Sequence, residues 1–339
     1  MARMANAFLH RFACLLRSAQ SLFTRNHTQS STQLPPQPQP QPQSNMQTFT
    51  TVASLREFLA TLSTGPGASS HSSVGFVPTM GNLHAGHATL VREALKHHTH
   101  TVVSVFVNPS QFAPGEDLAT YPRTLPEDTA LLQQLGVTAL FAPTAEEIYP
   151  QGGPTKGTFV ELDLPPCTDT LEARTRPQFF RGVATVVCKL LNIVQPHTAY
   201  FGQKDWQQLC VVRQLCRGLF LNVEIASVPI VRDSNGLALS SRNGYLSPEQ
   251  RLTAAAIHSG LVKGRDIVNA GRDDPVTANA VFRAVLSEWE QEAPGAFRVD
   301  YLAVCCRDTL APLEVIKGPC IILCAVYYAG VRLIDNELA

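Results

Sequence analysis

The sequence is poor in charged residues and has no long apolar run. Charged side chains make up 16% of the 339 residues, and 27 Lys and Arg balance 27 Asp and Glu, so the formal net charge is zero. This balance excludes a general electrostatic attraction to nucleic acid or to an anionic membrane. No apolar stretch reaches the roughly 20 residues that a membrane-spanning helix needs. We therefore expect neither nucleic acid nor a membrane as a partner, and local groups must hold any anionic substrate.

The nine cysteines show no pattern typical of a metal or redox site. They include no Cys-x-x-Cys pair and no Cys and His spacing that suggests zinc. Cys305 and Cys306 are adjacent, and Cys320 and Cys324 lie in a strand-like run. We expect the cysteines to be small buried residues in a reducing compartment, because free cysteine is among the most buried side chains.

Two common nucleotide-binding loops are also missing. The sequence has no Gly-x-x-x-x-Gly-Lys-Ser/Thr loop and no Gly-x-Gly-x-x-Gly placed between a strand and a helix. Both the usual phosphate-binding loop and the dinucleotide fingerprint are thus excluded, and other groups must bind any nucleotide.

Acidic residues are absent before Glu57, whereas arginine occurs early. Four arginines fall on one side of a helical projection: Arg3, Arg11, Arg17 and Arg25. Large apolar residues fall on the opposite side: Phe8, Phe12, Leu15, Leu16 and Phe23. A basic amphipathic helix without acidic residues is typical of an organellar transit peptide. It favours a mitochondrial address, with a plastid address as the second interpretation and an unstructured extension as the plainer one.

A Pro/Gln repeat at 34–42 follows this segment and is typical of a solvated linker. Met46 comes directly after it and is a candidate internal start, which would give a cytoplasmic protein. We therefore treat residues 1–45 as a targeting extension and linker that lies outside the folded part.

Residues 46–231 alternate between strand and helix patterns. A continuous β-branched run over 101–107 is typical of a strand buried on both faces. The other predicted strands lie at 74–78, 139–142 and 199–201, and the predicted helices at 55–62, 87–96, 127–135, 183–194 and 209–219. This alternation predicts an α/β fold with a Rossmann-like, doubly wound and mostly parallel sheet.

Residues 232–339 follow a different pattern. Ser247, Pro248 and Gln250 form a strong helix start, and a second helix is predicted over 275–292. Strands are predicted at 299–304, 320–326 and 328–334. These elements predict a second, smaller α+β domain at the C-terminus, which we expect to act as a lid.

Two histidines mark the turn from the first predicted core strand into a helix, within Pro78-Thr79-Met80-Gly81-Asn82-Leu83-His84-Ala85-Gly86-His87. Imidazoles three residues apart share one helix face. Gly86 between them lets a bulky group approach the backbone, and the helix N-terminus favours phosphate. A single histidine is usually a surface or core residue, but this string favours nucleotide chemistry at an α-phosphate.

Three further polar segments follow predicted strands or loops. Asn108 and Gln111 come after a buried strand, where amides can bind a polar acid, although Asn-Pro-Ser is also good turn chemistry. Lys204 follows the strand at 199–201 and could meet phosphates, whereas Asp205 and Gln208 have the spacing of a helix capping box. Ser240-Ser241-Arg242-Asn243 could grip phosphates, or form a plain solvated loop.

Together with Tyr121-Pro122-Arg123-Thr124, these segments resemble the pantothenate synthetase family over residues 47–339, within the wider H-x-G-H nucleotidyl-transfer class. The resemblance implies that catalysis rests on His84, His87, Lys204, Ser241 and Arg242. It implies that ATP contacts Pro78, Thr79, Met80, Gly81, Gly86, Gly202, Lys204, Asp205, Val231, Leu239, Ser240, Ser241 and Arg242. It implies that pantoate contacts Asn108, Gln111, Tyr121 and Gln208.

The resemblance further implies ATP and Mg²⁺ as cofactors, β-alanine as the second substrate, and a homodimer. The metal ligands stay unknown, and a role for Glu127 or Asp128 in holding Mg²⁺ stays open. Two positions depart from the family pattern: Leu239 replaces a usual Met, and Phe179 replaces a common His. The first exchange conserves volume, whereas the second removes a polar group near the site.

The implied reaction joins pantoate to β-alanine and yields pantothenate, AMP and pyrophosphate through a pantoyl adenylate. Two other classes compete with this interpretation. One is a nucleotidyltransferase of the same class whose nucleotidyl ester is the final product. The other is a nucleotide-binding protein without catalysis, which the presence of His84, His87, Lys204 and Arg242 disfavours.

The N-terminal extension gives a first prediction. A fluorescent protein fused to residues 1–45 should enter mitochondria, and removal of these residues should leave activity unchanged, because a Pro/Gln linker cannot pack on a core. The matched control replaces the four arginines at 3, 11, 17 and 25 with Gln and should stay in the cytosol. A diffuse cytosolic signal from the unaltered fusion would reject the targeting role.

Overall fold

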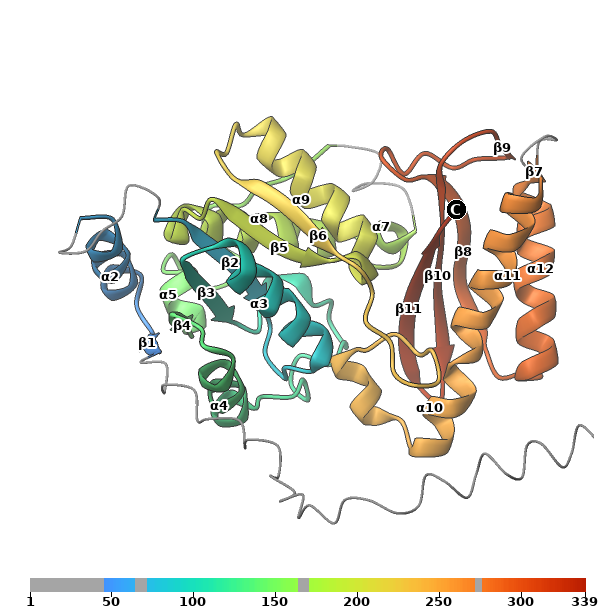
Figure 1. The fold of residues 1–339 in the computed structure, drawn as a ribbon, viewed down its shortest axis with the longest axis horizontal. Helices are drawn as coiled ribbons and strands as arrows, with labels where there is room; N and C mark the ends of the chain where they lie inside the picture. Colours follow the sequence, from blue (N-terminus) through green and yellow to red (C-terminus); the bar gives the residue numbers. More distant parts are fainter. Residues whose placement is uncertain (1–45, 65–71, 164–170, 272–275) are drawn as a thin grey trace, which may run out of the picture. The chain divides into compact units, whose positions relative to one another are not determined.

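The computed structural model describes residues 46–64, 72–163, 171–271 and 276–339, so the predicted extension at 1–45 lies outside the described residues. A six-stranded sheet of parallel pairs forms the first part, in the order β1-β4-β3-β2-β5-β6 (Figure 1). Its strands are β1 (Gln47–Phe49), β2 (Val74–Thr79), β3 (His100–Val105), β4 (Ala139–Phe141), β5 (Thr198–Gly202) and β6 (Glu224–Val228). The order reverses between β2 and β5, which makes their carboxyl ends the switch point of the sheet.

Helices cover both faces of this sheet. They are α2 (Val52–Thr64), α3 (Ala85–His97), α4 (Leu125–Leu135), α8 (Phe179–Val194) and α9 (Trp206–Gly218), with the short α5 (Ala145–Ile148) and α7 (Glu172–Thr175). Phe76 packs with residues of α2, α8 and α9, whereas its neighbour Val77 packs with residues of α3 and α4. Successive strand residues point to opposite faces, so both are fully buried. The predicted doubly wound, Rossmann-like fold is confirmed.

A three-stranded antiparallel sheet and two long helices form the C-terminal part (Figure 1). Its elements are α10 (Pro248–Ala254), α11 (Ala256–Ala270), α12 (Ala278–Glu292), β8 (Arg298–Cys306), β10 (Cys320–Tyr328) and β11 (Val331–Leu338), with the short pair β7 (Val276–Thr277) and β9 (Val315–Ile316). One face of β10 packs on α11 and α12 through Ile322, and the other packs on the first part through Ile321 and Leu323. The predicted smaller α+β part is confirmed.

The predicted helix start at Ser247 is confirmed, and the helical segment that follows it is interrupted once. Ser247 accepts from the backbone N–H of Gln250, and the Gln250 side chain accepts from the backbone N–H of Ser247 at 2.9 Å. The helical segment divides into α10 and α11 at Ala255, whose φ of −61° and ψ of −26° stay helical. Because no Gly or Pro marks this point, the sequence carried no signal for the division.

The strand predictions missed both edges of the large sheet. β1 has three residues, and only Val228 is buried in β6. Edge strands this short or exposed lack the apolar pattern on which a prediction depends. The last strand begins at Val331 rather than 328, because Ala329 and Gly330, with φ of 48° and 78°, form the tight hairpin turn after Tyr328.

None of the cysteines among the described residues forms a disulfide. Cys210, Cys216, Cys305, Cys320 and Cys324 are buried as predicted, whereas Cys188 and Cys306 are partly exposed. Cys14 and Cys167 lie outside the described residues. None of the helices in the described ranges is long and apolar enough to cross a membrane.

Side chains join the two parts near the end of β5. The Asn336 side-chain amide donates to the backbone carbonyls of Gln203 and Lys204, each at 2.9 Å. The Trp206 indole donates to the carbonyl of Arg307 at 2.9 Å. The C-terminal part therefore fixes the backbone around Lys204 directly. The predicted division at 231/232 falls in the segment between β6 and α10.

Candidate active site

A cavity of about 930 Å³ lies at the carboxyl ends of β2 and β5. All the predicted site residues except Gly81 line it. Its walls come from the loop after β2, the loop before α4, the start of α9, the segment before α10 and strand β11. This is the crevice in which open α/β sheets bind their ligands.

His84 and His87 cap the helix α3 with their own imidazoles. Nδ1 of His84 accepts from the backbone N–H of Gly86 at 3.1 Å, and Nδ1 of His87 accepts from the backbone N–H of His84 at 3.3 Å. The ring centroids lie 4.1 Å apart. Because both Nδ1 atoms accept, each neutral ring carries its proton on Nε2. The pair therefore offers two N–H donors to the cavity that both residues line.

Burial keeps both imidazoles uncharged. Burial and the nearby Lys204 lower the pKa of His84 from 6.5 to about 4, although Asp205 opposes this. Burial, His84 and Lys204 lower the pKa of His87 to about 3. At neutral pH these side chains therefore act as hydrogen-bond donors rather than as cations, and Lys204 supplies the positive charge beside them.

Gly86 lines the cavity, as predicted, and its missing side chain has a second consequence. A Cβ at this position would lie 2.9 Å from Cε1 of His84. The His84 ring folds over the glycine to reach its N–H, so the missing side chain makes room for the imidazole. The space was predicted to admit a ligand.

Asp128 holds the loop after β2 in place. Its two carboxylate oxygens accept from the backbone N–H groups of Asn82 and Leu83 at 2.9 and 2.8 Å, and the side chain is buried. Gly81 has a φ of 83°, which suits glycine, and it turns this loop without lining the cavity. Each Asp128 oxygen thus binds a backbone donor of this loop, and Asp128 is not among the residues that line the cavity.

Asn108 orients Gln111. Its side-chain amide donates to Oε1 of Gln111 at 3.0 Å and to the carbonyl of Gly182 at 3.2 Å, and its Oδ1 accepts from the Tyr149 hydroxyl at 2.7 Å. Asn108 is almost fully buried, and its Oδ1 also accepts from the backbone N–H of Ser110 at 3.3 Å, which is the contact that the turn interpretation predicts. It also lines the cavity, so its predicted contact with pantoate stays a prediction. Gln111 lines the cavity with its amide 3.1 Å from the sulfur of Met80.

The capping alternative for Asp205 is wrong. Asp205 stands before α9 but makes no side-chain hydrogen bond to the helix. Its Oδ2 lies 3.8 Å from Nζ of Lys204, and both residues line the cavity together with Gln208. The carboxylate and the ammonium thus both belong to the site.

The Ser240–Asn243 segment is not a plain solvated loop. Ser241 donates to the carbonyl of Asn82 at 3.3 Å, and Asn243 is buried. Arg242 donates from Nε and Nη2 to the two oxygens of Asp117, each at 2.9 Å. The segment therefore binds two loops of the first part, and Arg242 lines the cavity between them.

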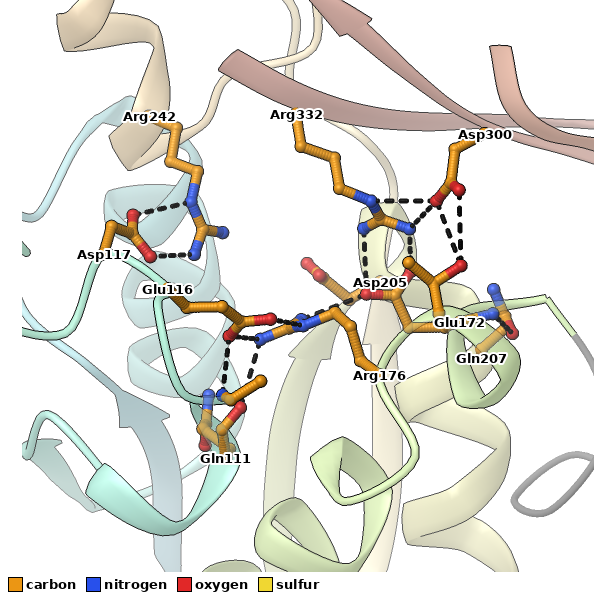
Figure 2. Close-up of polar contacts among 12 residues, drawn as sticks. Gln111, Glu116, Asp117, Glu172, Arg176, Asp205, Gln207, Arg242, Asp300 and Arg332 are labelled. Atoms are coloured by element: carbon orange, nitrogen blue, oxygen red, sulfur yellow. Dashed lines mark hydrogen bonds and ion pairs between the residues drawn. The ribbon is translucent and has the colours of Figure 1, made fainter. Parts of the chain in front are cut away.

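A network of arginines and carboxylates, missed by the sequence analysis, closes another wall of the cavity (Figure 2). Glu172 of α7 receives Arg332 of β11 at 2.9 and 2.8 Å and Arg176 at 3.0 Å. Arg332 also binds Asp300 at 2.7 Å, and Arg176 binds Glu116 at 2.6 and 2.7 Å. Burial alone lowers the pKa of Arg332, but Glu172 and Asp300 outweigh it and raise the pKa above its ordinary value.

No sequence signal revealed these partners, because Arg332 and Glu172 are 160 positions apart. The structure also explains the departure at Phe179. The Arg176 guanidinium lies 4.1 Å from the centre of the Phe179 ring, a cation–π contact that a neutral aromatic ring supports. The Phe179 ring therefore packs against Arg176 at the cavity wall.

Similarity to known proteins was found over nearly all of the folded part. The family model described as pantoate-beta-alanine ligase matches residues 47–338. A protein of Moorella thermoacetica named pantothenate synthetase is 43% identical over 291 residues, which cover 86% of this chain and 98% of that protein. A Saccharomyces cerevisiae protein named pantoate–beta-alanine ligase is 46% identical over 287 residues, covering 78% of this chain and 91% of that protein.

Solved structures of proteins with these names are also similar to this chain. The pantothenate synthetase of Thermus thermophilus superposes with a TM-score of 0.76 at 45% identity, covering 86% of this chain and 99% of that chain. A pantoate-beta-alanine ligase from Francisella tularensis, complexed with beta-gamma ATP and beta-alanine, has a TM-score of 0.67 at 31% identity. That match covers 86% of this chain and 97% of the Francisella chain.

The histidine geometry gives the second prediction. Nitrogen-detected NMR should find His84 and His87 as neutral Nε2–H tautomers from pH 8 down to about pH 5, because their pKa values are lowered to about 4 and about 3. Single His→Gln variants assign the two resonances. An imidazole of this pair that titrates near pH 6.5, or carries its proton on Nδ1, would contradict the cap geometry.

Proposed function

This chain belongs to the pantoate–β-alanine ligase family, and on that premise we propose how its cavity performs the ATP-dependent condensation of pantoate with β-alanine. The products are pantothenate, AMP and pyrophosphate, and the intermediate is a pantoyl adenylate. The observation that carries the proposal is the meeting of His84, His87 and Lys204 at the switch point of the sheet, in one cavity with Arg242.

The first step activates the carboxylate of pantoate. A carboxylate oxygen attacks the α-phosphorus of ATP, the new O–P bond forms, and the bond to the β-phosphate oxygen breaks to release pyrophosphate. Negative charge on the phosphates is met by the Nε2–H groups of His84 and His87 and by the ammonium of Lys204. These donors stand on two adjacent strand ends, so they are held before the substrates arrive.

Ser241 and Arg242 meet the phosphates from a separate segment. They lie on the stretch that joins the two parts of the chain, and their contacts to Asn82 and Asp117 place them over the loop after β2 and the loop before α4. We assign them to the phosphates that leave as pyrophosphate. Guanidinium suits this role because its planar N–H groups match phosphate oxygens.

The second step joins the amine. The neutral amino group of β-alanine attacks the acyl carbon, the C–N bond forms, the bond to the AMP oxygen breaks, and the nitrogen loses one proton to solvent. Gln111 and Gln208 provide amides for the hydroxyls and carboxylate of pantoate, and Tyr121 lines the same space. Burial raises the pKa of Tyr121, so its hydroxyl stays protonated and can donate. Asn108 orients the side chain of Gln111 through the hydrogen bond to its Oε1.

Mg²⁺ is proposed to arrive on the triphosphate. Among the described residues no group of three or more His, Cys, Asp or Glu side chains could hold a metal ion, and Asp128 is occupied by backbone donors. Mg²⁺ commonly keeps several waters and binds substrate phosphates with few protein ligands. When bound, it neutralises charge on the leaving pyrophosphate. A homodimer and a mitochondrial address for residues 1–45 are further proposals, resting on the family and on the arginine pattern.

An isotope experiment tests adenylation. With ¹⁸O in the pantoate carboxylate, one labelled oxygen should leave on AMP, and pyrophosphate should exchange into ATP with pantoate but without β-alanine. The matched control is Lys204→Ala, which should slow the exchange by roughly 10²–10³ because one phosphate donor is lost. Omitting pantoate should abolish the exchange. Label in inorganic phosphate with ADP as the co-product would instead require an acyl phosphate and refute the proposal.

A further inference from the structure

The loop before α4 carries two adjacent carboxylates that bind arginines from different parts of the chain (Figure 2). Glu116 binds Arg176 at 2.6 and 2.7 Å, and Asp117 binds Arg242 at 2.9 Å through each oxygen. Both carboxylates and both arginines line the cavity. The two pairs are chemically alike, but only one of them involves an arginine that we assign to the phosphates.

The Asp117 pair fixes the guanidinium of Arg242 and still leaves it able to bind a phosphate. Asp117 receives the N–H groups of Nε and Nη2, which determines the plane of the guanidinium. Nη1 makes no hydrogen bond to any residue that the structure describes, and Figure 2 draws no contact from it. The arginine thus retains unused donors in a fixed orientation at the cavity.

Other contacts hold the same segment to the same loop. The Tyr245 hydroxyl donates to the carbonyl of Thr120 at 3.3 Å, and the ring centre of Tyr121 lies 6.0 Å from Cζ of Arg242. Burial alone lowers the pKa of Arg242 and raises that of Asp117, but their mutual attraction outweighs burial in both cases. Both groups therefore stay charged at neutral pH, and the pair persists across the pH range of an assay.

We propose that Asp117 is a positioning residue, which orients Arg242 so that its remaining N–H groups donate to the phosphates of ATP. This inference rests on the proposed function of Arg242. A free arginine side chain has many rotamers, and Asp117 removes part of that freedom before ATP binds. Asp117 itself need not touch the nucleotide.

If Asp117 competed with phosphate for Arg242, a different kinetic result would follow. If the Asp117 carboxylate only occupied the place of a phosphate, ATP would have to displace it. Removing its charge would then lower the KM for ATP. Positioning requires the reverse, a higher KM for ATP or a slower adenylation step.

A double-mutant cycle on pyrophosphate exchange separates these roles. Asp117→Asn keeps the size of the side chain and should reduce kcat/KM for ATP on the order of 10-fold, because the guanidinium loses its ionic partner. In an Arg242→Ala background the same substitution should change kcat/KM by less than about 2-fold, because its target is gone. Asp117→Glu should restore part of the lost activity.

Glu116→Gln is the matched control. It removes the neighbouring carboxylate, whose partner is Arg176, so its effect should be the same with and without Arg242. Melting temperatures of all variants within a few degrees of the wild type show that the comparison reports on intact protein.

Three results would overturn the positioning role while leaving the proposed function intact. They are an unchanged kcat/KM in Asp117→Asn, a lower KM for ATP in that variant, or an Asp117→Asn effect that persists without Arg242. Wild-type exchange in Arg242→Ala would instead remove Arg242 from phosphate binding and the inference with it. The ¹⁸O experiment tests the proposed reaction independently of either result.

Discussion

The parallel pairing of β2 with β5 is the constraint on which the site depends. Gly75 is paired with Thr198 and Phe76 with Ala199, so the two strands run side by side and end at the same edge of the sheet. β2 delivers the loop that leads to His84 and His87, and β5 delivers Lys204. The histidines and the lysine lie far apart in the chain and meet only through this pairing. The lowering of both histidine pKa values by Lys204 reflects that proximity.

The cap at α3 explains how buried imidazoles serve an anionic ligand without carrying charge. Backbone N–H groups hold both Nδ1 atoms, and this sets the tautomer. A neutral donor pair costs less to bury than two cations would. The cationic groups are instead Lys204 and Arg242, which come from different segments of the cavity wall and have carboxylate neighbours in Asp205 and Asp117. The positive charge in this site therefore comes from individual side chains, because the chain as a whole has a formal net charge of zero.

Much of the fold was predictable because its signals are local. The buried run at β3, the start of a helix at the histidine string and the cap at Ser247 each depend on a few neighbouring residues, and the structure has all three. The ion pairs were not predictable, since Glu172 and Arg332 or Asp117 and Arg242 are joined only by the tertiary fold. Two residues for which the sequence left a structural and a functional role open behave differently in the structure. The side chain of Asn108 makes the turn contact to Ser110 and also lines the cavity, whereas Asp205 makes no capping hydrogen bond to α9.

The central claim is that the α-phosphate of ATP binds where the ends of β2 and β5 meet. A crystal structure with pantoate and an ATP analogue whose α,β-bridge is a methylene group tests this directly. We expect α-phosphate oxygens within hydrogen-bond distance of Nε2 of His84 or His87 and of Nζ of Lys204, with Arg242 on the β- or γ-phosphate. A triphosphate bound elsewhere in the cavity, with these three groups facing the pantoate or solvent, would contradict it.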